Sequence, residues 1–558
     1  GIQAATLGTQ HLRSEIPLSE QIKTLPEYLQ QAGYYTTNNR KTDYNFDFNE
    51  HSIWDESSGE AHWRNRPDAK PFFSVFNITI THEGNANNRR VETDSLLKQL
   101  KHRVNPDSVN IPPYLPDTDE MRRIWARYYD LIQVMDQKAG AILDQLEADG
   151  LTDDTIVMFW SDHGYGLPRY KRWPYKSGLH VPLIVHVPEK FEHVAEELQG
   201  SQSDRIINLV DLAPTVLNLA GADIPETMQG IPFMGPESDH KRDFMVATRS
   251  RADDVYDVSR TVIDDRYLYL RNYMPHKVWV QDAVIFSDDK WSYKELNRVK
   301  QQENLPPTAI KMFEFKPLEE LYDLQEDPYE TTNLAQSRSH RGIIQTMRKR
   351  LNDWILGTRD TGFLPESEMM IRSKNTTPYD MAQDRDQYHL KEILAMAENV
   401  GKTNSLDSEY LDKLDSNDST IRYWALMGLL SNYTITGDKL SGSVAGRVKE
   451  MLKDASPAVQ LTASELLCTI STCSDEALSV ITTHLNNGEY PTVVLQAAIT
   501  ARRIGEKAAP ITSVLKSVRA KYSGDTGSRG YKNWSYPMFI GFAVDQALEN
   551  CGMPWENQ

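Results

Sequence analysis

Cysteine, basic charge and long apolar runs are all scarce in this chain of 558 residues. Its 3 cysteines, Cys468, Cys473 and Cys551, predict neither a disulfide framework nor a Cys-x-x-Cys metal site, and they leave the redox compartment undetermined. No stretch of about eighteen uninterrupted apolar residues exists, so the sequence predicts no membrane-spanning helix. The formal net charge of -18 argues against a general nucleic-acid binder, which needs a basic face to offset phosphate charge.

The composition is that of a folded globular protein. Hydrophobic residues make up 39% and charged residues 25%, and the length predicts two or more domains. The negative net charge does not exclude an anionic small substrate, because a local cluster of Lys, Arg and metal can outweigh the overall field.

One loop concentrates residues that can carry chemistry. It lies between an apolar run at 155–160, which predicts a buried strand, and a second strand at 181–187. Open α/β sheets place their chemistry in loops at the carboxyl ends of strands. An Asp-His pair can hold a divalent cation, and neighbouring cations can hold an anionic substrate. By composition alone, a solvated surface loop is the simpler interpretation. The residues concerned are Asp162, His163, Arg169, Lys171, Arg172 and His180.

The order of these residues favours chemistry. Ser-Asp-His-Gly at 161–164, followed by Lys-x-x-x-Tyr-x-x-Gly-x-His-Val-Pro-Leu-Ile-Val at 171–185, resembles the second metal-binding segment of the sulfatases. These belong to the alkaline-phosphatase-like superfamily. Four more motifs continue the resemblance in the same order, at 24–37, 71–83, 211–230 and 320–334, so that it covers about residues 1 to 370. Phe-Asn-x-Thr-x-Thr-His-Glu at 76–83 is most similar to the branch of the heparan N-sulfatases.

The resemblance implies the position of the nucleophile. In sulfatases a Cys or Ser-x-Pro-Ser-Arg motif is followed closely by a segment like 3–13 of this chain. We therefore expect the sequence to begin just after that motif, with the formylglycine made from the Cys or Ser, and the strand carrying paired aspartates, upstream of Gly1. Residues 1–558 alone are then expected to show little or no sulfatase activity.

The resemblance also implies roles for three residues that contact sulfate. Lys41 matches a lysine that contacts the nucleophile and the sulfate, although Arg40 replaces the family's glycine. Asp43 stands where a histidine is usual, and a turn or capping role is as compatible with it. His82 and Lys171 match residues that bind the sulfate. Glu83 either orients the imidazole of His82 or faces solvent.

Asp162 matches a ligand of a single calcium ion. His163 takes the second position, where Asn or Gln is usual; because calcium prefers oxygen ligands, His163 either ligates the ion or contacts the sulfate or nucleophile. His180 is expected close to the substrate. Arg169 and Arg172 either bind a second anionic group, such as a uronate or another sulfate, or are solvated surface charges.

The implied reaction is hydrolysis of a sulfuric ester of a carbohydrate. The hydrated formylglycine would attack sulfur, the metal and Lys41 would favour its deprotonated hydroxyl, and His82 and Lys171 would stabilise the sulfuryl oxygens. Two alternatives stay open: a catalytically inactive sulfatase-like scaffold, and a phosphodiesterase or phosphonate hydrolase of the same superfamily. The family is commonly exported, which implies a periplasmic or secreted protein.

The expected architecture is α/β followed by all-α. We expect an alkaline-phosphatase-like sandwich with a mixed central sheet over 1–300, a small C-terminal subdomain over 301–370 and a linker over 371–398. The segment 420–430 recurs at 457–467 and 492–501, a period of about 35 residues. This resembles HEAT repeats and predicts a helical array over 399–558. Protein docking, self-association, glycan contact and a packed appendage are all compatible with it, and Cys468 and Cys473 are expected to fill its core.

Overall fold

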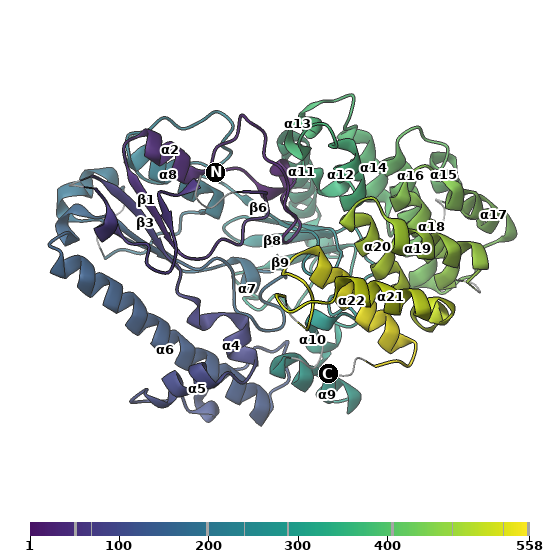
Figure 1. The fold of residues 1–558 in the computed structure, drawn as a ribbon, viewed down its shortest axis with the longest axis horizontal. Helices are drawn as coiled ribbons and strands as arrows, with labels where there is room; N and C mark the ends of the chain where they lie inside the picture. The colour runs from purple at the N-terminus through teal and green to yellow at the C-terminus, as the bar shows by residue number, and fades with distance from the viewer. Residues whose placement is uncertain are drawn as a thin grey trace.

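The computed structural model describes residues 1–48, 53–67, 70–196, 200–238, 240–286, 290–402, 407–470, 473–527 and 529–554. Figure 1 shows an α/β half that carries the N-terminus and an all-helical half formed by the later part of the chain. Sheet strands β6, β8 and β9 lie between the two halves, at the centre of the molecule.

Two small sheets form the outer part of the α/β half. Strand β1 (Tyr35–Asn39) lies between β2 (Glu56–Ser57) and β3 (Phe72–Phe76), all parallel. Strands β4 (Val157–Trp160) and β5 (Leu183–His186) pair antiparallel. We predicted a buried strand at 155–160; β4 forms there, but every residue of β3 and β4 is only partly buried. The reason is a cavity of about 1750 Å³, mostly apolar, which both strands line.

Helices flank these sheets where the sequence predicted them. Helix α2 (Leu25–Gln31) begins with a capping box between Thr24 and Glu27 and is followed by Gly33 at φ 92°. Helix α6 (Asp119–Ala148) is capped by the Thr118 hydroxyl, which accepts from the Met121 N–H. Helix α8 is Leu212–Leu219. The other helices of this half are α1 (Ala4–Leu7), α4 (Glu83–Asn87), α5 (Val91–Lys98), α7 (Lys176–Leu179), α9 (Trp291–Gln301) and α10 (Pro307–Ile310).

An antiparallel sheet of four strands joins the two halves. Its order is β6 (Met245–Arg249), β7 (Ser259–Ile263), β8 (Tyr267–Asn272) and β9 (Glu319–Asp323). Strands β7 and β8 pair antiparallel around Asp264 and Asp265. Helix α11 (Arg341–Thr358) follows β9. Between them, Asn333 accepts from the Leu321 N–H and donates to the Glu319 carbonyl, which ties its loop to β9.

The linker predicted over 371–398 is wrong, because this segment is helical and packed. It contains α13 (Pro378–Gln383) and α14 (Leu390–Asn399), next to α12 (Glu366–Arg372). Met369, Met381 and Tyr388 are fully buried in the same core as the later helices. Met369 and Met381 are therefore core residues, because the flexible side chain of methionine can fill irregular gaps.

The remaining helices stack in succession. The repeated segments become α16, α18 and α20, and α16 packs on α18, α18 on α20 and α20 on α22. That these are HEAT repeats stays a prediction. The bounds are α15 (Asp407–Lys413), α16 (Ser419–Thr436), α17 (Gly442–Glu450), α18 (Pro457–Ile470), α19 (Asp475–Asn487), α20 (Pro491–Arg503), α21 (Thr512–Tyr522) and α22 (Tyr536–Asn550).

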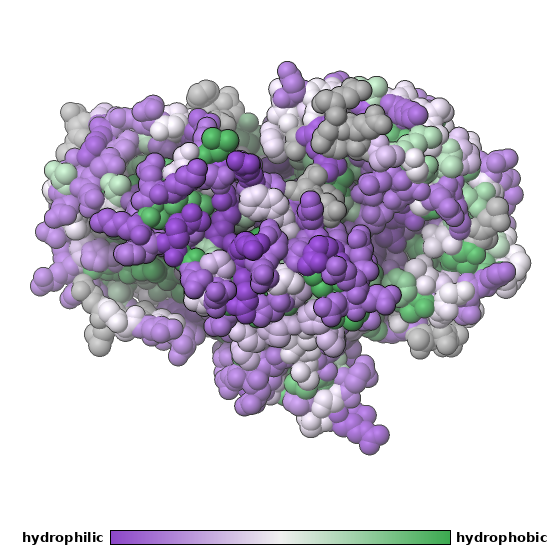
Figure 2. Space-filling view, turned by 90° about the horizontal axis from the view of Figure 1, so that it is seen from below, coloured by the Kyte–Doolittle hydropathy of each residue, from purple (hydrophilic) through white to green (hydrophobic). Residues whose placement is uncertain are grey.

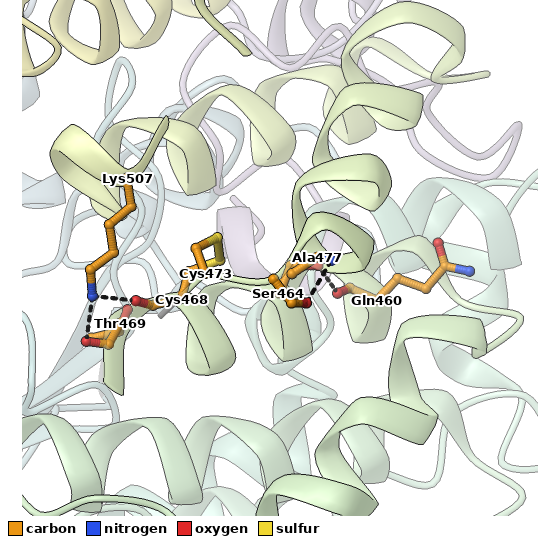
Figure 3. Close-up of a disulfide and its surroundings, with 8 residues drawn as sticks. Gln460, Ser464, Cys468, Thr469, Cys473, Ala477 and Lys507 are labelled. Carbon is orange, nitrogen blue, oxygen red and sulfur yellow. Dashed lines mark hydrogen bonds between the residues drawn. A yellow bond between two sulfur atoms is a disulfide. The ribbon is translucent and has the colours of Figure 1, made fainter. Parts of the chain in front are cut away.

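A disulfide joins Cys468 and Cys473 at the end of α18 (Figure 3). We expected both residues only to fill the core. Cys468 is indeed fully buried, but it is also bonded to Cys473. The Lys507 ammonium donates to the Cys468 carbonyl at 2.6 Å. Cys551 is a free thiol.

A buried ion pair connects the α/β half to the helices. Arg251 donates to both carboxylate oxygens of Glu366, at 2.7 and 2.9 Å, and the Tyr536 hydroxyl donates to the same carboxylate at 2.7 Å. These residues come from the end of β6, from α12 and from α22. Burial alone would raise the pKa of Glu366, but Arg251 and His11 lower it to about 2. The carboxylate is therefore charged at neutral pH.

Figure 2 shows one face of the molecule coloured by hydropathy. That face is mostly hydrophilic, with hydrophobic residues scattered over it. Within the described ranges, no helix has both the length and the hydrophobicity that crossing a bilayer requires.

We expect Glu366→Ala to lower the free energy of unfolding by about 3–5 kcal/mol, because Arg251 would remain buried without its counter-charge. Urea denaturation followed by circular dichroism measures this. Asp353→Ala is the control: it breaks an exposed pair with Lys349, and its effect should stay below about 0.5 kcal/mol. Equal effects of the two substitutions would contradict the role assigned to Glu366.

Candidate active site

The loop between β4 and β5 is folded tightly on itself. The Gly164 N–H donates to the Gly178 carbonyl at 3.0 Å. A Cβ atom at Gly164 would lie 2.2 Å from the Ser177 carbonyl oxygen, and one at Gly166 would lie 2.1 Å from Cβ of Glu83. Only glycine fits at either position, so the glycines fix where the intervening charged side chains lie.

Asp162 and Lys41 form the centre of the candidate site. The Lys41 ammonium lies 2.6 Å from Asp162 Oδ2, although the two residues are 121 positions apart. His163 Nε2 lies 3.7 Å from Asp162 Oδ1. Burial opposes ionisation of Asp162, but His163, Lys41 and Lys171 outweigh it and lower the pKa of the carboxyl group. The carboxylate is charged and, with 57% of its side chain exposed, open to the adjoining cavity.

His82 presents a neutral imidazole. It precedes α4, and its Nδ1 accepts from the Gly84 N–H at 3.2 Å, which leaves Nε2 as the protonated nitrogen. Burial, with the nearby ammonium groups of Lys171 and Lys41, lowers the pKa of His82 to about 4. At neutral pH this histidine is therefore a hydrogen-bond donor without a charge.

Glu83 gathers three cations beside His82. Both of its carboxylate oxygens accept from Arg172, at 2.8 and 3.1 Å, and its oxygens lie 3.2 Å from the Lys290 ammonium and 3.9 Å from that of Lys171. Arg172 also donates to Asp253 at 2.9 Å. Burial would raise the pKa of Glu83, but Arg172 and Lys290 hold it well below its ordinary value. Glu83 is thus a buried anion that positions cations, and it does not face solvent.

Two lysines in this cluster have pKa values below that of an exposed lysine. Burial lowers the pKa of Lys171, and the attraction of Glu83 offsets only part of the effect. Burial and the charge of Arg172 lower the pKa of Lys290 to about 8. Sequence reasoning missed Lys290: it begins α9 far along the chain from the other residues, and its local sequence carries no recognisable motif.

The structure does not bring all the predicted residues together. Arg169 is buried away from the cavity, stacked over Tyr114 and Tyr175 and donating to the Glu330 carbonyl at 2.7 Å. Neither a substrate contact nor a solvated surface charge describes it. His180 follows α7, is exposed and lines the cavity.

The residues of the candidate site line a cavity of about 2250 Å³. Its walls come from both halves of the molecule, since residues of β6, of α22 and of the loop before α22 line it as well. The predicted site residues on its surface are Lys41, Asp43, His82, Glu83, Asp162, His163, Lys171, Arg172 and His180.

The donor set fits only part of a calcium site. Asp162 supplies an exposed carboxylate, and His163 supplies a nitrogen. Calcium takes six to eight oxygen ligands, and no group of three or more metal-ligating side chains occurs in the described parts of the chain. Asp162 and His163 therefore do not complete a calcium site, and we derive no chemical step through the ion.

Known sulfatases are similar to this chain over part of its length. The sulfatase family matches residues 1–222, and the family of the C-terminal part of N-sulphoglucosamine sulphohydrolases matches residues 163–305. An ulvan-active sulfatase of Formosa agariphila is 36% identical over 428 residues, which are 68% of this chain and 69% of that protein. Human N-sulphoglucosamine sulphohydrolase is 25% identical over 281 residues, 46% of this chain and 52% of that protein.

Among solved structures, a 2-O GAG sulfatase covers 64% of this chain and 80% of its own at 17% identity. Its TM-score is 0.44, a similarity too low to bear on the fold.

We expect His82 to be neutral above pH 5, with its proton on Nε2, and to titrate only near pH 4, because burial and the charge of Lys171 both disfavour its protonated form. Nitrogen-15 NMR of the histidine side chains measures both properties, and His82→Asn identifies the resonance. A midpoint near the ordinary value of about 6.5 would contradict this environment.

Proposed function

Because the chain belongs to the sulfatase family, the hydrolases of sulfuric esters, we propose that it removes sulfate from a sulfated carbohydrate at the cavity around Lys41, His82, Asp162 and Lys171. The observation that carries the proposal is the convergence of these four side chains from three distant segments on one cavity. The relative from Formosa agariphila favours a sulfated polysaccharide of the ulvan type as substrate.

We assign binding and charge stabilisation to three of these residues. The ammonium groups of Lys41 and Lys171 would attract the sulfate, and the neutral imidazole of His82 would donate its Nε2–H to one of its oxygens. Fixed donors of this kind stabilise the charge that develops on sulfuryl oxygens during displacement. Glu83 would position Lys171 and Arg172 and keep the cluster from repelling itself.

Arg172 has little capacity left for a substrate. Its guanidinium already donates to Glu83 and Asp253. Of the two arginines that we expected to bind a second anionic group, neither is therefore retained in the proposal. Lys290, which lines the same cavity, is a better candidate for binding a second anionic group of the substrate.

The nucleophile and the cation stay proposals. A formylglycine would supply the attacking hydroxyl group, and Asp162 would be one of the oxygen ligands of a calcium ion whose other ligands are not among the described residues. What supports both proposals is membership of the sulfatase family, whose model matches residues 1–222.

A periplasmic or secreted location is part of the proposal. The disulfide between Cys468 and Cys473 supports it, because disulfides persist in oxidising compartments.

The test is release of inorganic sulfate from ulvan oligosaccharides and from an N-sulfated glucosamine by the intact protein. We expect Lys171→Met to lower kcat/KM about 100-fold or more, through loss of a donor to the sulfuryl oxygens. Lys190→Met, which removes a surface lysine paired with Asp154, is the control and should change it less than twofold.

The other outcomes separate the alternatives. Turnover of bis(4-nitrophenyl) phosphate without turnover of any sulfate would identify a phosphodiesterase. Binding of sulfated oligosaccharide without turnover of either substrate would identify a catalytically inactive scaffold.

A further inference from the structure

A loop from the helical half reaches into the candidate active site. It connects α21 to α22, and residues 523–527 and 529–535 of it are described. Figure 1 shows this segment, in yellow, extending from the helices toward the centre of the molecule. Together with the first turns of α22 it brings Arg529, Trp534, Met538 and Phe542 to the cavity that Lys171 and His82 line.

The loop has a fixed conformation. Tyr531 is fully buried, and its hydroxyl donates to the Gly541 carbonyl at 3.2 Å. The Gly527 N–H donates to the Tyr531 carbonyl at 2.7 Å, and the Lys532 N–H donates to the Tyr522 carbonyl at 3.0 Å. These bonds hold the loop on the helices from which it comes, so the position of Trp534 is determined by the helical half.

Trp534 is nevertheless 52% exposed. Leaving half of a large aromatic side chain in water forgoes a substantial part of its transfer free energy. An exposed tryptophan on a rigid loop at the wall of a polar cavity can bind a ligand that stacks on its ring.

A short chain of contacts connects Trp534 to the reaction centre. The guanidinium of Arg13 stacks on its indole ring, 5.5 Å from the centroid, and donates to the Trp534 carbonyl at 3.0 Å. Arg13 also lies 3.5 Å from Asp43. Asp43 follows Lys41 by two residues, and Lys41 contacts Asp162. The indole ring and the sulfate-binding residues are therefore parts of one continuous wall.

We propose that Trp534 is a carbohydrate-binding residue, which stacks against a sugar ring next to the ring whose sulfate is removed. Aromatic side chains bind the apolar face of a sugar and leave its hydroxyl groups in water. Arg13 beside the indole ring suits a carboxylate or second sulfate on that neighbouring sugar. This proposal rests on the proposed function. It adds that the helical half helps to determine the length and type of the glycan that the cavity accepts.

The experiment compares two substrates of the intact protein: ulvan oligosaccharides, which extend over several sugars, and 4-nitrophenyl sulfate, which has none. We expect Trp534→Ala to lower kcat/KM for the oligosaccharides about tenfold more than for 4-nitrophenyl sulfate, mainly through KM, because a stacking contact is lost. Trp534→Phe should restore most of the loss. The control is Phe315→Ala, which removes an aromatic that is 46% exposed outside the cavity.

Equal losses on both substrates, or no loss, would overturn the proposal. If the wild-type protein releases no sulfate from either substrate, the proposed hydrolysis fails, and calorimetric titration with the same oligosaccharides then decides about Trp534. Weaker binding by Trp534→Ala than by Phe315→Ala supports the subsite. Equal binding by the two variants, or no binding by the wild type, contradicts it.

Discussion

Glu83 holds Arg172, Lys171 and Lys290 together at the wall of the cavity, and the rest of the candidate site depends on this arrangement. Three cations this close would repel one another and lose their hydration without a buried anion among them. The loop that carries Lys171 and Arg172 can approach Glu83 only because Gly166 has no side chain. As a result, a neutral His82 lies beside a positively charged wall of the cavity, to which an anionic substrate can bind.

The helical half is not a separate appendage to this site. Its core is continuous with that of the four-stranded sheet, and buried pairs such as Arg251 with Glu366 and Arg502 with Asp254 cross between the halves. Such pairs tolerate little displacement, because separating them would leave charges buried without partners. This rigidity allows a loop some five hundred residues along the chain to place Trp534 at the same cavity as Lys41, His82 and Lys171, which lie in the first third.

Much of the fold and of the site could be predicted from the sequence. The apolar run at 155–160 predicted β4, the recurring segments predicted α16, α18 and α20, and motif order indicated that Lys41, His82, Asp162 and Lys171 belong to one site. The failures have physical causes. The half-exposure of β3 and β4 depends on a cavity between distant segments, and the burial of Arg169 depends on Tyr114, Tyr175 and Glu330. Lys290 and Trp534 reach their partners through tertiary folding alone, for which local sequence carries no signal.

The central claim is that sulfate binds at the wall formed by Lys41, His82 and Lys171. A crystal structure of the intact protein with a sulfated oligosaccharide tests it most directly. The account predicts a sulfate oxygen at hydrogen-bonding distance, about 2.7–3.2 Å, from the Lys171 ammonium and from His82 Nε2. A glycan whose sulfates all lie away from both groups would contradict it.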